Sequence, residues 1–153
     1  MKVSAKADYA VRAAAELAAA QDTGSLVRAE TIATAQGIPQ RFLENILSDL
    51  RHAGLVQSQR GAEGGHRLNR PAAEISVADI IRAVDGPLAA VRGERPESVT
   101  YAGPAEPLQR VWIAVRKSLR DVVEQVSLAD LAGSTLPDPV NALADDPEAW
   151  TTR

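Results

Sequence analysis

Cysteine is absent from this chain of 153 residues, which excludes disulfides, thiolate zinc sites and cysteine nucleophiles. Aromatic residues make up only 3% of the sequence, whereas alanine and leucine are plentiful, and this balance favours packed helices over a β-sandwich. No apolar run approaches the roughly 20 residues that span a bilayer, and the first residues lack the apolar segment of a signal peptide. We therefore expect a cytoplasmic protein without a membrane segment.

The net charge is small, −3 at pH 7, but it is unevenly divided along the chain. Residues 1–70 hold nine Lys and Arg against seven Asp and Glu, a balance of +2. Residues 71–153 hold eight Lys and Arg against 13 Asp and Glu, a balance of −5. The acidic excess therefore lies in the C-terminal half. The balance of residues 1–70 is too small to indicate a polyanionic partner by itself, so any such partner must be argued from pattern rather than from bulk charge.

Three helices are predicted near the N-terminus. Ser4 can cap a helix over residues 5–20, and a second helix over residues 27–36 ends at Gly37. Pro39 suits the first position of a third helix, where its missing N–H has no consequence. The third helix has one apolar face with helical spacing, formed by Leu43, Ile46, Leu47 and Leu50.

A β-hairpin is predicted directly after the third helix. Residues 55–60 and 66–69 have strand character, and GAEGG at 61–65 forms the turn between them. Two short helices, a tight turn and a hairpin in this order are typical of a winged helix-turn-helix. Ser76 then caps a fourth helix over residues 77–84, so the expected fold class is mainly α with a small β-hairpin wing.

The third helix and the hairpin carry side chains suited to DNA. A recognition helix presents its N-terminal residues to the major groove, where Arg, Gln, Asn and Glu can hydrogen bond to base edges. Arginines beside a slender glycine turn suit a minor groove or phosphates. The predicted DNA-binding residues are Pro39, Gln40, Arg41, Glu44, Asn45, Ser48, Arg60, Gly61, Gly64, Gly65, His66 and Arg67. The alternative for the helix alone is the solvated face of an amphipathic helix.

The longest predicted helix begins at Pro107 and continues to about Val126. Its apolar residues lie on about one third of its circumference, and they are Leu108, Val111, Trp112, Val115, Leu119, Val122, Val123 and Val126. Such a stripe can serve an intramolecular core, but its length, roughly 30 Å for twenty residues, favours self-association as a homodimer.

These elements divide the chain into four expected segments. A DNA-binding domain covers residues 1–86, and a loop at 87–106 is the expected effector or sensor segment. The dimerisation helix and a short terminal helix capped by Ser127 cover residues 107–132. Residues 133–153 carry four acids, one base and three prolines, and we expect a flexible or loosely docked acidic tail.

The segment FLENILSDLRHAGLVQSQRGAEGGHRL (42–68), with KVSAKADYAVRA at the start and the later ISVADIIRAVDG, resembles the Rrf-type family of bacterial winged-helix repressors. The resemblance covers roughly residues 1–126 and is most specific between Gly54 and Gly65. It implies a homodimer on a palindromic operator, with the long C-terminal helix swapped against its partner. It also implies that Arg60 serves the wing contact and that the helix starting at Pro39 reads bases.

The chain departs from this family in ways that bear on cofactors. Many members hold an iron–sulfur cluster with three cysteines in the loop before the long helix, and the matching loop here has none. Asp8 stands where members contribute a non-cysteine ligand from the first helix, and His66 stands where relatives often have tyrosine. His52 and His66 also lack a metal-ligand pattern. We therefore expect no metal and no cofactor.

The sequence thus predicts a homodimeric repressor that binds double-stranded DNA and is not an enzyme, since no nucleophile motif or buried acid–base pair is evident. Regulation would come from a small molecule, in a candidate pocket lined by the 88–106 loop and Trp112, or from a partner protein; a constitutive repressor is the remaining alternative. The alternative is a winged-helix module for protein–protein interaction, which the low net charge and the acidic C-terminal half would suit.

Overall fold

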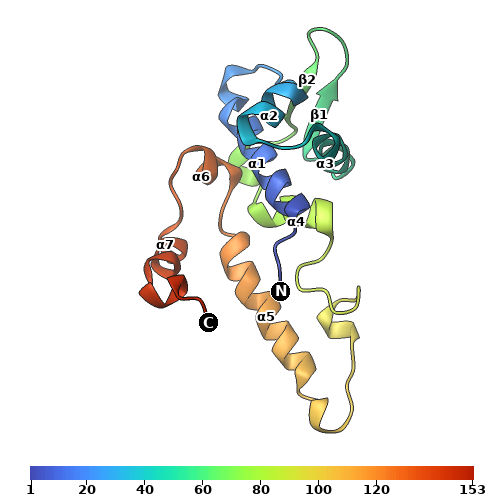
Figure 1. Ribbon diagram of the computed structural model, residues 1–153, viewed down its shortest axis with the longest axis vertical. Helices are drawn as coiled ribbons and strands as arrows, with labels where there is room; N and C mark the ends of the chain where they lie inside the picture. The colour runs from blue at the N-terminus through green and yellow to red at the C-terminus, as the bar shows by residue number, and fades with distance from the viewer.

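The structure, a computed structural model that describes residues 1–153, begins with the three predicted helices (Figure 1). They are α1 (Ala5–Ala19), α2 (Ala29–Gln36) and α3 (Gln40–His52). The Ser4 hydroxyl accepts a hydrogen bond from the Ala7 amide at 2.9 Å, which confirms the predicted cap of α1. Pro39 is the N-cap of α3 rather than its first residue, so α3 starts one residue later than predicted.

The hairpin pairs β1 (Val56–Gln59) with β2 (Gly65–Leu68) in an antiparallel register that sets Val56 opposite Leu68. Val27 lies on the other side of β2, where it exchanges two backbone hydrogen bonds with His66, at 2.7 and 2.8 Å. This pairing keeps Val27 extended and explains why α2 begins two residues later than predicted. The Arg28 guanidinium donates to the Ala62 carbonyl at 2.7 Å, which ties the hairpin turn to the start of α2.

The core of the DNA-binding domain is built around α1. Helices α3 and α4 (Val77–Asp85), strand β2 and the short α6 (Leu128–Ala132) all pack against it. The buried side of α1 is mostly alanine, and these small side chains let several elements approach one helix. The fully or nearly buried residues of α1 are Ala7, Ala10, Ala13, Ala14, Leu17 and Ala18.

The chain after helix α5 (Leu108–Val123) returns to this core. Ser76 and Ser127 each form a capping box, with Asp79 and Asp130 respectively, at the starts of α4 and α6. The two caps lie side by side, because the Val77 amide donates to the Val126 carbonyl and the Leu128 amide donates to Ile75, both at 2.9 Å. Val126 is therefore buried in its own domain, and its predicted place on a dimer seam is wrong.

Helix α5 (Leu108–Val123) projects away from the DNA-binding domain, at the opposite end from the hairpin (Figure 1). It ends three residues earlier than predicted. The 87–106 segment runs beside α5 and contains two single 3₁₀ turns, Pro96–Ser98 and Gly103–Ala105. No helix of the protein is both long and apolar enough to cross a membrane.

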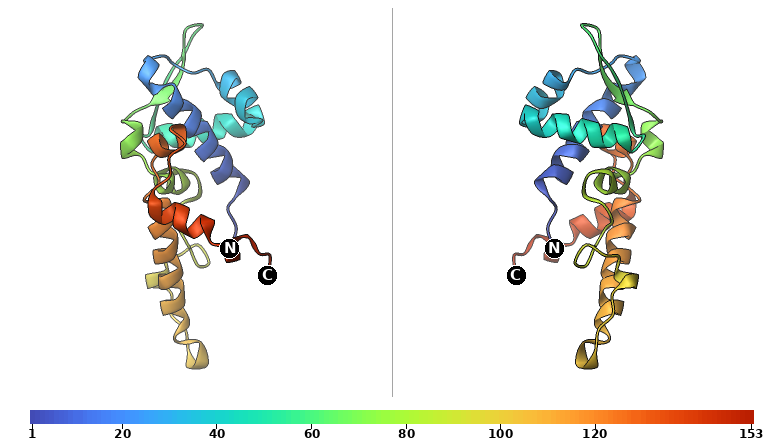
Figure 2. Two further views of the ribbon diagram at one scale, coloured as in Figure 1. Left: turned by 90° about the vertical axis from the view of Figure 1, so that its left-hand side faces the viewer. Right: turned by 90° about the vertical axis from the view of Figure 1, so that its right-hand side faces the viewer.

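The C-terminal residues are partly helical. Helix α7 (Asp138–Asp145) follows a stretch without regular structure and is followed by a 3₁₀ turn at Pro147–Trp150. The Trp150 indole donates to the Ala144 carbonyl at 2.6 Å, so these two elements pack on each other. Every residue of the segment is exposed or half-buried, and α7 lies outside the main body (Figure 2). The tail therefore contains regular structure, and its looser attachment to the rest of the chain stays a prediction.

The tight hairpin turn generates a prediction about Gly64. A Cβ atom at Gly64 would lie 2.1 Å from the Gln59 carbonyl oxygen, a contact with rigid backbone. We expect Gly64→Ala to lower the free energy of unfolding by about 1–3 kcal/mol, because the turn must open to admit the methyl group. Urea unfolding measures this change. The control is Glu63→Ala in the same turn, where the side chain is exposed, and equal stability of the two variants would contradict the prediction.

Candidate nucleic-acid interface

Helix α3 has a clear division between its two faces. Its four predicted apolar residues are all buried, between 0 and 3% exposed, which confirms the predicted apolar face. The other face is open to solvent, with Gln40, Arg41, Glu44 and Asn45 exposed and Ser48 half-buried. Arg41 has no carboxylate within 4 Å, so its guanidinium is available to a ligand. This face has the donors and acceptors needed to read base edges.

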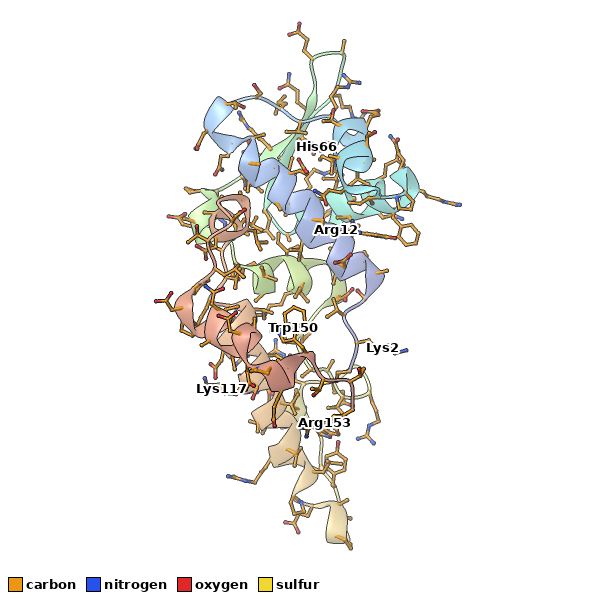
Figure 3. The ribbon with its side chains drawn as sticks, turned by 60° about the vertical axis from the view of Figure 1, so that its left-hand side comes forward. Lys2, Arg12, His66, Lys117, Trp150 and Arg153 are labelled. Carbon is orange, nitrogen blue, oxygen red and sulfur yellow. The ribbon has the colours of Figure 1, made fainter.

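Contacts with α1 and α2 set the angle of α3. Lys6 pairs with Asp49 at 2.6 Å, and the rings of Tyr9 and Phe42 meet edge to face with centroids 5.9 Å apart. These contacts fix the flank of α3 that adjoins α1. Arg12, labelled on α1 in Figure 3, donates to the Gln36 carbonyl at the end of α2 at 2.6 Å.

The hairpin supplies a second group of exposed cations. Arg60 is exposed and has no carboxylate partner within 4 Å. Arg67 on β2 is also exposed, and its Nε donates to the Gln57 side chain on β1 at 3.1 Å. Gly61 lies exposed at the start of the turn. The hairpin extends beyond the helices (Figure 2), and Arg60 and Arg67 are its exposed cations.

Gly64 and Gly65 have a different role from the predicted one. Both are buried, and a Cβ atom on Gly65 would lie 2.7 Å from the Val27 carbonyl oxygen. They are glycines because backbone passes directly over them, so we correct the prediction that they face DNA. Their contribution to the interface is to hold the hairpin closed against the segment before α2.

His66, labelled in Figure 3, lies on β2 between Ser58 of β1 and the extended residue Val27. Its ring is half-buried, and Nδ1 lies 2.7 Å from the Ser58 hydroxyl across the two strands. Burial lowers the pKa of His66 below its ordinary value, and the positive charge of Arg51 lowers it further. His66 is therefore neutral at pH 7 and adds no positive charge to the interface.

Two residues at this end of the molecule were missed by the sequence prediction. Phe42, at the start of α3, is 50% exposed and flanks the polar face. Arg28 contacts the hairpin turn and lies 3.6 Å from Glu30, whose pKa is lowered first by a backbone hydrogen bond and also by Arg28. The Arg28–Ala62 contact spans 34 residues, so no local sequence pattern could have found it.

Comparison with known proteins agrees with this geometry. Residues 3–134 match the model of the Rrf2 family, described as iron-dependent transcriptional regulators. The chain belongs to the Rrf2 family. Rv1287 of Mycobacterium tuberculosis, whose name describes an HTH-type transcriptional regulator, is 51% identical over 146 residues, which are 95% of this chain and 90% of that protein. CymR of Bacillus subtilis, also an HTH-type regulator, is 35% identical over 88% of this chain and 92% of its own length.

Solved structures of Rrf2 relatives have the same fold. CymR, the global cysteine regulator of B. subtilis, superimposes with a TM-score of 0.73 and 33% identity, covering 88% of this chain and 98% of that chain. IscR of T. potens superimposes with a TM-score of 0.68 and 33% identity, covering 100% of this chain and 93% of that chain. The predicted winged helix-turn-helix is therefore confirmed, and this Rrf2 protein is a DNA-binding transcription regulator.

The iron named in the family description has no suitable ligands here. The 87–106 loop contains neither cysteine nor histidine. No group of three or more His, Cys, Asp or Glu side chains is placed to hold a metal ion, and Asp8 pairs with Arg12 at 3.0 Å. Iron–sulfur clusters in proteins are held chiefly by thiolates. The residues of this Rrf2 chain therefore do not fit such a cluster.

The lowered pKa of His66 predicts a dependence of stability on pH. The unfolded chain binds a proton near the ordinary pKa of 6.5, whereas the folded chain resists protonation at His66. The free energy of unfolding should therefore fall as the pH drops below 6.5. Urea unfolding at neutral and mildly acid pH measures this loss. His66→Asn should reduce the loss, and the exposed His52→Asn should leave it unchanged; a loss of equal size in all three proteins would refute the assignment.

Proposed function

We propose that this protein is a homodimeric repressor that binds a palindromic operator, with α3 in the major groove and the hairpin beside the flanking backbone. The observation that carries the DNA contact is the exposure of two arginines that have no carboxylate partner, Arg41 on α3 and Arg60 beside the hairpin turn. A recognition helix and a wing contact DNA in this manner in winged helix-turn-helix proteins.

The two arginines have different proposed roles. Arg41 belongs to the first turn of α3, which in helix-turn-helix proteins is the part that meets base edges, and Arg can bind guanine O6 and N7 with two hydrogen bonds. Gln40, Glu44 and Asn45 supplement it on the same face. Arg60 precedes the hairpin turn, where a long flexible cation suits a phosphate or a narrow minor groove.

The proposal of a dimer is supported by helix α5. None of its residues is buried, although its apolar stripe contains Leu108, Val111, Trp112, Val115, Leu119, Val122 and Val123. Val111 is 49% exposed. The other six stripe residues are half-buried, so a partner could remove their remaining apolar area from water, at roughly 25 cal/mol for each Å² buried. A second copy of α5 covers such a stripe symmetrically. It also sets the distance between the two DNA-binding domains that contact the half-sites of a palindrome.

Repression follows in this proposal from occupation of promoter DNA by the dimer. Genomic footprinting of the tagged protein identifies the bound sites, and transcription in vitro from one of those promoters measures the direction of the effect. We expect bound sites with two-fold symmetry and lower transcript yield with added protein. Sites without symmetry, or a higher yield, would contradict the operator model or the direction of regulation respectively.

Fluorescence anisotropy on a footprinted operator tests the two arginines. Arg41→Ala should cost about 1–3 kcal/mol and reduce discrimination between the operator and a site with the contacted base changed. Arg60→Ala should weaken binding to both DNAs alike and lower the slope of log affinity against log salt by about 1. Lys117→Ala, an exposed cation on α5 far from the interface, is the control (Figure 3). Unchanged affinity, discrimination and salt slope in both variants would rule out this interface.

Sedimentation equilibrium tests the dimer. Val115→Glu places a charge in the centre of the proposed seam, and we expect it to raise the dimer dissociation constant by a factor on the order of 100 or more. Arg110→Glu on the opposite side of α5 is the control and should remain dimeric. A wild-type monomer, or equal effects of the two substitutions, would exclude α5 as the dimer seam.

A further inference from the structure

A small cavity lies where α4, α5 and the 87–106 loop meet. Its volume is about 190 Å³, and its lining is dominated by charge. The side chains that matter are four arginines, one carboxylate and one apolar residue, namely Arg82, Arg95, Arg116, Arg120, Glu97 and Leu88. The cavity shares no residue with the nucleic-acid interface. Helix α5, which lines it, extends away from the hairpin in Figure 1.

The carboxylates within reach do not neutralise these arginines. Arg116 forms an ion pair with Glu97, and Arg82 forms one with Glu124, which also lies 3.8 Å from Arg120. Asp79 is a further 4.0 Å from Arg82, at the limit of an ion pair. Arg95 has no carboxylate within 4 Å. Four guanidinium groups thus face three carboxylates, of which only Glu97 lines the cavity.

Two of the four arginines, Arg82 and Arg116, are partly buried, whereas Arg95 is exposed and the Arg120 side chain is 44% exposed. The Arg116 side chain is only 16% exposed and that of Arg82 is 34% exposed. Glu97 has a lowered pKa because of a backbone hydrogen bond, the Arg116 hydrogen bond and the charges of Arg116 and Arg95, so it stays ionised and keeps Arg116 in position. Gln109 fixes the same loop by donating to the Val99 carbonyl at 2.8 Å.

The cavity borders the proposed dimer seam. At 3.6 residues per turn, Arg116 and Arg120 lie roughly 90° around α5 from the line through Val115 and Leu119, next to Val123 at the edge of the stripe. Trp112, once expected to line an effector pocket, instead donates to the Tyr101 hydroxyl at 3.0 Å and helps to hold the loop on α5. The polar pocket begins one helical turn beyond it.

We propose that this cavity is an effector site for a small dianion that carries phosphate or carboxylate groups. Each guanidinium has five N–H donors in a planar fork that matches the oxygens of these anions. Only part of this donor set is used by Glu97 and Glu124. A dianion would therefore replace repulsion among neighbouring cations with charge-assisted hydrogen bonds, while Leu88 provides an apolar wall beside it.

The position of the cavity gives the bound anion a route to control DNA binding, and this part rests on the proposed function. Arg82 belongs to α4, which packs on α1 in the core of the DNA-binding domain. Arg116 and Arg120 belong to α5, the proposed dimer helix. An anion held by α4 and α5 together would favour one angle between the DNA-binding domain and the dimer helix. That angle sets the spacing of the two DNA-binding domains on an operator.

Isothermal titration calorimetry on the full chain without DNA tests the site. Inorganic phosphate and succinate are the two probes, titrated separately at constant ionic strength and pH. We expect saturable binding of at least one of them, weakened roughly tenfold or more by Arg95→Gln and by Arg120→Gln. Arg110→Gln removes an exposed cation of the same helix outside the cavity and should bind like the wild type.

The outcome of the titration decides whether the cavity binds anions and which class of anion it prefers. Phosphate binding alone identifies a phosphorylated effector, succinate binding alone identifies a polycarboxylate, and either supports the site. No binding of either probe at millimolar concentration, or equal weakening by all three substitutions, overturns it. Operator affinity measured with and without the bound anion then tests the regulatory step: an unchanged affinity refutes control through this site, whereas a failure of operator binding itself leaves the titration result standing.

Discussion

The close packing against the alanine-rich side of α1 is the constraint on which the rest of the structure depends. Four of its alanines and Leu17 are at most 2% exposed, and helices α3, α4 and α6 and strand β2 all meet this one helix. Small side chains permit that convergence, and any larger side chain there would displace an element from the centre of the domain. The orientation of α3 and of the hairpin therefore follows from how α1 is buried.

The same packing divides the chain into a closed core and a helix that lies outside it. Residues up to α4, together with α6, form a closed core, because the paired caps at Ser76 and Ser127 bring residues 126–132 back to α1 and α4. Helix α5 is left outside, held by α4 at its C-terminal end and by the 87–106 loop along one flank. An amphipathic helix so placed can respond to a partner or a ligand without disturbing the core, since few buried contacts would change.

Charge is organised around the same division. Arg41 of α3 and Arg60 of the hairpin are exposed without carboxylate partners and are available to a polyanion, and the acidic excess lies in the C-terminal half of the chain. The arginines at the α4–α5 junction are instead drawn together in a confined space, which suits a small ligand rather than a duplex. A protein with a net charge of −3 thus has two separate cationic regions, one on α3 and the hairpin and one at the α4–α5 junction.

Local patterns in the sequence determined most elements of this protein, because helix periodicity, serine caps and glycine turns act over a few residues. The caps at Ser4, Ser76 and Ser127, the buried side of α3 and the existence of the hairpin were all predictable in this way. Only the tertiary structure decided the Val27–His66 pairing, the burial of Gly64 and Val126, and the gathering of arginines beside α5. These features join residues that are tens of positions apart, and no periodicity within one element records which distant segment will lie against it.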